Sequence, residues 1–236
     1  MSDATTLRIA AVFAFLSPLA IFAGIPFAAQ LAGAGGPGPI DYGNGAVLAR
    51  LAELGSAAVY VDFFALLGPI FALPATMGWY VLLRDEGRLA LLGIVMWYFG
   101  MAFVVAQDAL QLALTSTLPA AYAAADVVTR AAIESVGGSL ARSIEVLAFS
   151  GHLPESFGSI LLLLLMLRCA VIPRWLTAVG LLGATLAFVS GTLGFLFPDV
   201  TLLGIGVPIG IFVILFWGIG MGVVMLREAK RLAPRT

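Results

Sequence analysis

Histidine, cysteine and lysine are almost missing from this 236-residue chain, which contains one of each: His152, Cys169 and Lys230. A single cysteine excludes an intramolecular disulfide and any zinc or iron–sulfur site built from several cysteines. Charge is scarce as well, because 11% of the residues are charged, against about 25% in a typical soluble domain. The net charge of −1 and the lack of a basic stripe argue against nucleic acid as a partner.

Apolar residues make up 61% of the chain, and its mean hydropathy is +1.08. A membrane-spanning helix needs about 20 such residues. We therefore predict an all-α polytopic membrane protein, one integral membrane domain over residues 1–236 with six transmembrane helices. We read the first span as a retained helix and not as a cleaved signal peptide, because it is long enough to cross the bilayer. The predicted spans are about 7–31, 57–83, 89–114, 155–172, 175–197 and 203–226.

The segments between the spans have their own signals. Glycine and proline in Gly33–Gly45 predict an aqueous loop, and Pro198-Asp199 predicts a short turn. Thr115–Thr117 is expected to close the third span, with Pro119 opening a new helix. Residues 118–150 are amphipathic and predict an outer helical hairpin, broken at Gly137-Gly138, on the membrane surface or over the bundle.

The basic residues predict an orientation. Nine of the twelve flank the inner ends of the predicted spans, and only Arg50, Arg130 and Arg142 lie in outer segments. Lysine and arginine accumulate on the cytoplasmic side of membrane proteins. We therefore predict a protein of the cell inner (cytoplasmic) membrane with both termini in the cytoplasm.

Polar residues gather near the outer ends of spans two to four. Counted at 1.5 Å per residue, three acids lie roughly 26–32 Å from the inner edge of a hydrocarbon layer about 30 Å thick. Acids near lipid usually face the bundle interior or a wet cavity. The sequence thus predicts an outer-facing polar pocket. Its residues are Asp62, Gln107, Asp108, Gln111, Glu145, His152 and Glu155.

Three interpretations of this pocket stay open. The polar groups can simply bond to one another and to water at the membrane rim. They can bind a small polar or amphipathic ligand or relay protons. They can also hold a single metal ion, zinc or iron, through His152, Glu155 and Asp108, because histidine with carboxylates suits both metals and HxxE spacing puts two ligands on one helical face.

The last span is rich in glycine. Gly218 and Gly222 form a pair of small residues that allows helices to approach closely. This pattern predicts packing within the chain, with a homo-oligomer or a larger membrane complex as the alternative.

The stretch IPRWLTAVGLLGATL from Ile172 combines a basic-proline turn, Pro173-Arg174-Trp175-Leu176, with a glycine-rich span. Gly151-His152 and Phe157-Gly158 form the polar segment before the fourth span. From about Trp97 to Leu226 the chain resembles an uncharacterised bacterial family of six-helix integral membrane proteins, domain-of-unknown-function family 4386. The resemblance implies the six-span topology and supplies no reaction or catalytic residue.

We therefore expect a protein of the lipid bilayer with a binding, sensing or accessory role and no enzymatic activity. One alternative is a metal-dependent enzyme acting at the outer leaflet, with His152, Glu155 and Asp108 as ligands or as general acid and base. The other is a structural subunit of a larger complex.

Overall fold

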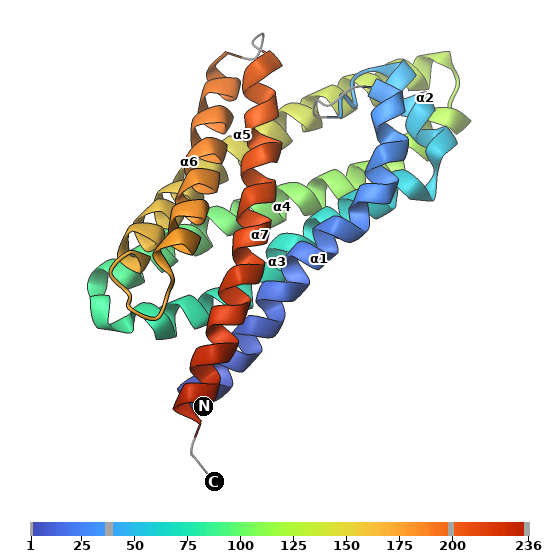
Figure 1. Cartoon of the computed structure of the whole chain (residues 1–236). Coiled ribbons are helices and arrows are strands. Elements are labelled where there is room, and N and C mark those ends of the chain that lie inside the picture. The colour runs from blue at the N-terminus through green and yellow to red at the C-terminus, as the bar shows by residue number, and fades with distance from the viewer. Residues whose placement is uncertain (1, 36–39, 198–200, 234–236) are drawn as a thin grey trace. The chain divides into compact units, whose positions relative to one another are not determined.

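The computed structural model describes residues 2–35, 40–197 and 201–233, and every regular element in these ranges is helical. Figure 1 shows the elements in chain order. They are α1 (Asp3–Gly35), α2 (Gly45–Leu54), α3 (Ser56–Leu83), the short η1 (Arg84–Glu86), α4 (Arg88–Ala124), α5 (Val127–Met166), α6 (Arg174–Leu196) and α7 (Thr201–Leu232). Six helices of the described ranges, all but α2 and η1, are long and apolar enough to cross a membrane. The predicted all-α, six-span architecture is confirmed.

Contacts divide the chain into two compact units. Unit 1 comprises Met1–Leu19, Gly68–Ala102 and Phe149–Thr236, and unit 2 comprises Ala20–Leu67 and Phe103–Ala148. Helices α1, α3, α4 and α5 each contribute residues to both.

The core of unit 1 is built on tryptophan and glycine. The ring of Trp79 on α3 lies 5.4 Å from that of Trp97 on α4 and 5.3 Å from that of Trp217 on α7. Gly158 on α5 sits against the α4 backbone, because a Cβ there would lie 2.6 Å from the Trp97 nitrogen. Small residues of this kind let membrane helices approach closely.

Unit 2 is organised around the short helix α2. The Asn44 side chain caps its start by accepting from the backbone N–H of Ala46 at 2.9 Å. Gly55 ends it with φ at 56°, a backbone conformation that glycine adopts readily and that turns the chain into α3. The buried core of the unit comprises Tyr42, Leu48, Leu51, Ala58, Leu114 and Ile144.

The predicted hairpin between the third and fourth spans has its break elsewhere. Helix α4 continues through Thr115–Thr117 and Pro119, and the chain turns at Ala125-Asp126. The break expected at Gly137-Gly138 is wrong, since α5 runs through both residues. A Cβ on Gly137 would lie 2.3 Å from the Tyr42 carbonyl oxygen, so glycine serves close packing here.

Helix α5 also settles how residues 143–154 relate to the fourth span, because they belong to the same 40-residue helix. At 1.5 Å per residue this helix is about 60 Å long, twice the thickness of the hydrocarbon layer. Its end precedes the predicted boundary at 172, because Arg168 and Cys169 donate to carbonyls three residues back. Of the predicted loop Gly33–Gly45, residues 33–35 belong to α1. Residues 36–39 and the predicted turn Pro198-Asp199 lie outside the described residues.

Candidate functional site

The predicted pocket residues fall into both units. Unit 2 contains Asp62, Gln107, Asp108, Gln111 and Glu145, whereas unit 1 contains His152 and Glu155. The structure therefore defines two polar clusters, one in each unit, and the seven-residue pocket stays a prediction.

The unit 2 cluster is centred on Asp62, which is 2% exposed. Its Oδ1 accepts a hydrogen bond from Gln111 Nε2 at 2.7 Å, and its Oδ2 accepts one from the Thr115 hydroxyl. Gln111 and Thr115 lie four residues apart on α4, so one face of that helix presents both donors. Among the described residues Asp62 makes no ion pair. Two neutral donors alone satisfy this carboxylate.

Tyr42 completes the cluster from the segment before α2. Its hydroxyl lies 2.5 Å from Thr115 Oγ1 and donates there, because the Thr115 proton is already given to Asp62. Burial raises the pKa of the Tyr42 hydroxyl well above its usual value, the Thr115 hydrogen bond opposes this rise, and the charge of Asp62 adds to it. Tyr42 therefore remains a hydrogen-bond donor.

Tyr42 and Thr115 were absent from the predicted pocket residues. Tyr42 is a lone aromatic residue in a glycine-rich stretch, and such a residue can anchor a segment that otherwise lacks side chains. Thr115 follows Gln111 by four residues, and that spacing is the signal that could have identified it.

A groove of about 550 Å³ lies beside this cluster in unit 2. Arg142 and Glu145 line it, and neither makes a hydrogen bond or an ion pair with a described residue. Glu134, also in its lining, accepts from the Tyr122 hydroxyl at 2.9 Å. The lining residues are Ile40, Asp41, Gly43, Glu134, Ser135, Gly138, Ser139, Ala141, Arg142 and Glu145. The groove thus offers charged groups of both signs.

Gln107 and Asp108 have a different setting from Asp62. Both are partly buried on α4, and neither makes a hydrogen bond or an ion pair within the described ranges. Of the five predicted residues in this unit, the structure joins only Asp62 and Gln111 by a hydrogen bond.

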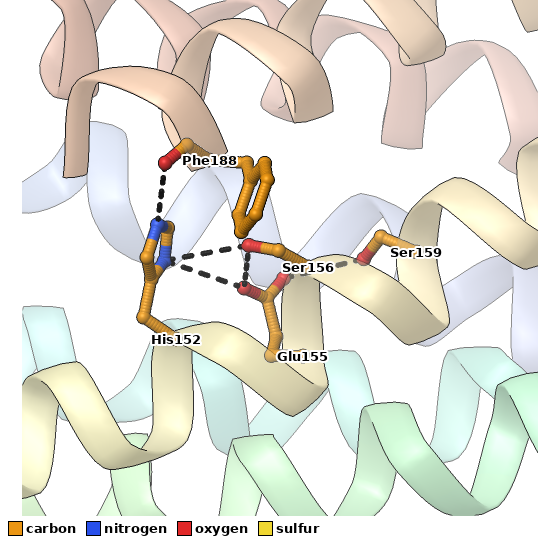
Figure 2. Close-up of polar contacts among 5 residues, drawn as sticks. All are labelled: His152, Glu155, Ser156, Ser159 and Phe188. Atoms are coloured by element: carbon orange, nitrogen blue, oxygen red, sulfur yellow. Dashed lines mark hydrogen bonds and ion pairs between the residues drawn. The ribbon is translucent and has the colours of Figure 1, made fainter. Parts of the chain in front are cut away.

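The unit 1 cluster lies on the second half of α5 (Figure 2). His152 Nε2 approaches the Phe188 carbonyl oxygen of α6 at 3.4 Å. A carbonyl oxygen only accepts, so this contact places the hydrogen of a neutral ring on Nε2. Nδ1 then carries no hydrogen and lies 3.5 Å from Ser156 Oγ and 3.9 Å from Glu155 Oε2.

The Glu155 side chain accepts hydrogen bonds from residues of its own helix, α5. Its Oε1 accepts from the Ser159 hydroxyl at 3.3 Å and its Oε2 from the Ser156 hydroxyl at 3.5 Å. The Glu155 and His152 side chains are 23% and 20% exposed, so a small molecule can contact both. Ser156 and Ser159 were absent from the prediction, although they follow His152 and Glu155 by four residues and that spacing could have indicated them.

Glycines make room for this cluster on both sides. A Cβ on Gly191 of α6 would lie 2.5 Å from His152 Nε2, so only glycine leaves space for the imidazole. On the α4 side, a Cβ on Gly100 would lie 2.4 Å from the Glu155 backbone nitrogen. The cluster is therefore built into the helix packing of unit 1.

A family model described as "Domain of unknown function (DUF4386)" matches residues 9–227. The chain belongs to the DUF4386 family. The match extends beyond the part of the chain in which we noted the resemblance and includes the glycine-rich stretch Gly33–Gly45. No curated protein and no solved structure matches the chain.

Membership in the DUF4386 family assigns no chemistry to these residues. Whether they can hold a metal ion therefore depends on how their side chains are arranged. Among the described residues, no group of three or more His, Cys, Asp or Glu side chains is arranged to hold a metal ion. His152 and Glu155 offer one nitrogen and a carboxylate, and Asp108 belongs to the other unit. The zinc or iron site at these three residues stays a prediction.

Proposed function

We propose that this DUF4386 protein binds or senses a small polar or amphipathic ligand in the cell inner membrane and is not an enzyme. The observation that carries the proposal is the buried Asp62 carboxylate on an apolar helix, satisfied by neutral donors and linked through Tyr42 to a groove. An ionisable residue within a membrane-spanning helix is costly and usually serves a function.

The link from the groove to Asp62 is short. Asp41 and Gly43, which line the groove, flank Tyr42 in the chain. Tyr42 donates to Thr115, and Thr115 donates to Asp62 on α3. A ligand that contacts this segment would therefore act on the hydrogen bonds of a carboxylate inside α3. This continuity favours sensing over a purely structural role.

The charge distribution supports the proposed orientation, with both termini in the cytoplasm. All nine basic residues that we expect on the cytoplasmic side belong to unit 1, and the three expected outside belong to unit 2. Positive residues favour the cytoplasmic side. In this orientation the groove of unit 2 is open to ligands that reach the outer face.

Extraction of the purified protein tests the proposal. We expect an organic molecule, identified by mass spectrometry, to accompany the wild type in near-stoichiometric amount and to fall at least tenfold in Arg142→Ala/Glu145→Ala. Arg50→Ala/Glu53→Ala is the matched control, because it removes the same two residue types from unit 2. Those two side chains pair with each other at 2.8 Å and are exposed.

Elemental analysis of the same samples separates the alternatives. A wild type that contains no organic molecule but about one zinc or iron, lost in His152→Ala, would favour the metal-dependent enzyme. An equal loss of the organic molecule in both double variants would contradict binding in the groove. Partner proteins that co-purify with every variant would instead favour the structural subunit.

A further inference from the structure

Basic residues in the described part of unit 1 divide into two groups. Three of them pair with acids: Arg84 with Asp3, Arg168 with Glu86 at 3.8 Å and Arg231 with Glu228 at 3.3 Å. The other five are exposed and make no ion pair with any described residue. They are Arg8, Arg88, Arg174, Arg227 and Lys230.

These bases gather at one end of unit 1. The Arg84–Asp3 and Arg168–Glu86 pairs join the start of α1 and the turn after α5 to η1. Cys169 in the turn after α5 also contacts the Leu82 carbonyl oxygen near the end of α3, at 3.6 Å. Arg88 follows η1 directly, and Arg174 begins α6 directly after the turn that contains Cys169.

Helix α7 brings its last two turns to the same end. A Cβ on Gly78 of α3 would lie 2.7 Å from both Ala10 Cβ and Met225 Sδ, so α1, α3 and α7 meet there. Figure 1 shows the start of α1 beside the end of α7. Arg227 and Lys230 follow Met225 within two turns. The five unpaired bases thus form one positively charged surface, here called the basic end.

Exposed apolar side chains accompany the bases in sequence. Leu89 follows Arg88 and is 49% exposed, Trp175 follows Arg174 and is 68% exposed, and Leu226 precedes Arg227 and is 36% exposed. An aromatic or aliphatic group beside a cation at a helix end is the arrangement of a membrane interface, where the apolar group enters the acyl region and the cation stays at headgroup level.

We propose that the basic end binds anionic phospholipids through their headgroup phosphates. The intramolecular ion pairs occupy three arginines, and the other five bases, which have no partner among the described residues, can bind the phosphate of a lipid. Guanidinium groups bind phosphate in a bidentate manner, and unpaired basic residues beside a span attract anionic lipids. Arg174 with Trp175 is the part of this surface that fits a membrane interface best, since it combines an exposed cation with the most exposed of the three apolar neighbours.

Lipid retention in nanodiscs tests the proposal. The protein is reconstituted in phosphatidylcholine containing phosphatidylglycerol, released into the gas phase, and its retained lipids are counted by native mass spectrometry. We expect the wild type to retain phosphatidylglycerol several-fold over its share of the mixture. Arg174→Gln/Arg227→Gln/Lys230→Gln should lose most of this preference. The matched control is Arg84→Gln/Arg168→Gln/Arg231→Gln, which removes three paired cations from the same end and should retain the preference.

Three results would overturn the proposal. A wild type that retains both lipids in proportion to the mixture has no such site. An equal loss in both triple variants would show that total charge alone attracts the lipid. Full competition by inorganic phosphate would assign the surface to a free anion. If size-exclusion chromatography shows that the first triple variant does not fold, Arg174→Gln alone is compared with Arg168→Gln and should lose part of the preference.

Discussion

The two units of this protein differ in charge and in how they treat buried polar groups. Unit 1 contains nine basic and six acidic residues, and unit 2 contains three basic and seven acidic residues. Their net charges are therefore +3 and −4. Because their net charges are opposite in sign, the two units suit different partners. The bases of unit 1 fit the proposed lipid phosphates, and three acids of unit 2, Asp41, Glu134 and Glu145, line the groove.

The interiors of the two units also differ in whether their buried polar groups have hydrogen-bond partners. In unit 1 the indole N–H groups of Trp79 and Trp217 are buried without a hydrogen-bond partner among the described residues, so ring packing dominates there. In unit 2 the buried Asp62 has a partner for each carboxylate oxygen. Close packing of rings thus dominates the tryptophan core of unit 1, whereas the interior of unit 2 contains a polar network around Asp62.

The largest effect is expected from Gly158→Ala in unit 1. Its Cβ would lie 2.6 Å from the Gly93 carbonyl oxygen and from the Trp97 nitrogen, and both are backbone atoms of a rigid helix. Overpacking of this kind costs about 1–3 kcal/mol. We expect a lower thermal unfolding temperature in detergent, measured by circular dichroism.

Gly218→Ala is the control for this packing argument. Gly218 belongs to the same unit, and a Cβ there would meet only the Ala14 carbonyl oxygen at 3.9 Å. Alanine also favours a helix by about 1 kcal/mol over glycine, so this variant should be neutral or slightly stabilised. A loss of stability in Gly218→Ala equal to that in Gly158→Ala would contradict the packing argument.

The second prediction concerns Asp62. Asp62→Leu removes the acceptor of Thr115 and Gln111 and should cost about 1–3 kcal/mol of unfolding free energy. Asp62→Asn should cost nothing or stabilise by about 0.5–2 kcal/mol, the usual range of a stabilising substitution, because it removes a charge from an apolar helix. An amide can donate to Thr115, whose hydroxyl can then donate to Tyr42, so every group keeps a partner.

Thermal unfolding of both variants is compared with that of Asp85→Asn, an exposed acid of unit 1 without a partner in the described ranges. Its effect should remain within about 0.5 kcal/mol of zero. If Asp62→Asn were as unstable as Asp62→Leu, the charge itself would be required. Unit 2 would then bind a cation at Asp62, contrary to the network described here.

The sequence predicted the spans but not the shape of the elements between them. Long apolar runs indicate membrane helices strongly, so all six were found. Gly137-Gly138 was misinterpreted as a break, because a glycine that permits close packing and a glycine that ends a helix look identical in sequence. Only the position of Tyr42, distant in the chain, distinguishes the two roles.

The candidate site was predictable in part for a related reason. Acids on apolar helices are rare, so Asp62, Asp108 and Glu155 were conspicuous. Thr115, which donates to Asp62, and Tyr42, which donates to Thr115, were not, because both are common residue types whose role depends on the packing of separate segments. The glycine pair Gly218 and Gly222 also has neighbours within the chain, since a Cβ on Gly222 would lie 2.9 Å from the Phe15 ring. Association of chains through α7 stays a prediction.

The smallest effect is expected at Asp126, an exposed acid of unit 2 that contrasts with the buried Asp62. Its Oδ1 accepts from the Thr129 backbone N–H at 2.8 Å at the start of α5, and this hydrogen bond lowers the pKa of the carboxyl group below its usual value. A lowered pKa in the folded state means that the carboxylate stabilises the protein above the ordinary pKa of aspartate, about 3.9, and that this contribution is lost as the pH falls through the lowered value. Asp126→Asn should therefore unfold at a slightly lower temperature than the wild type at pH 7, measured by thermal denaturation, and the difference should shrink as the pH falls below about 3.9. A difference that persists unchanged at low pH would show that the amide disturbs the cap itself, and the charge of this exposed acid would then play no part in the stability of unit 2.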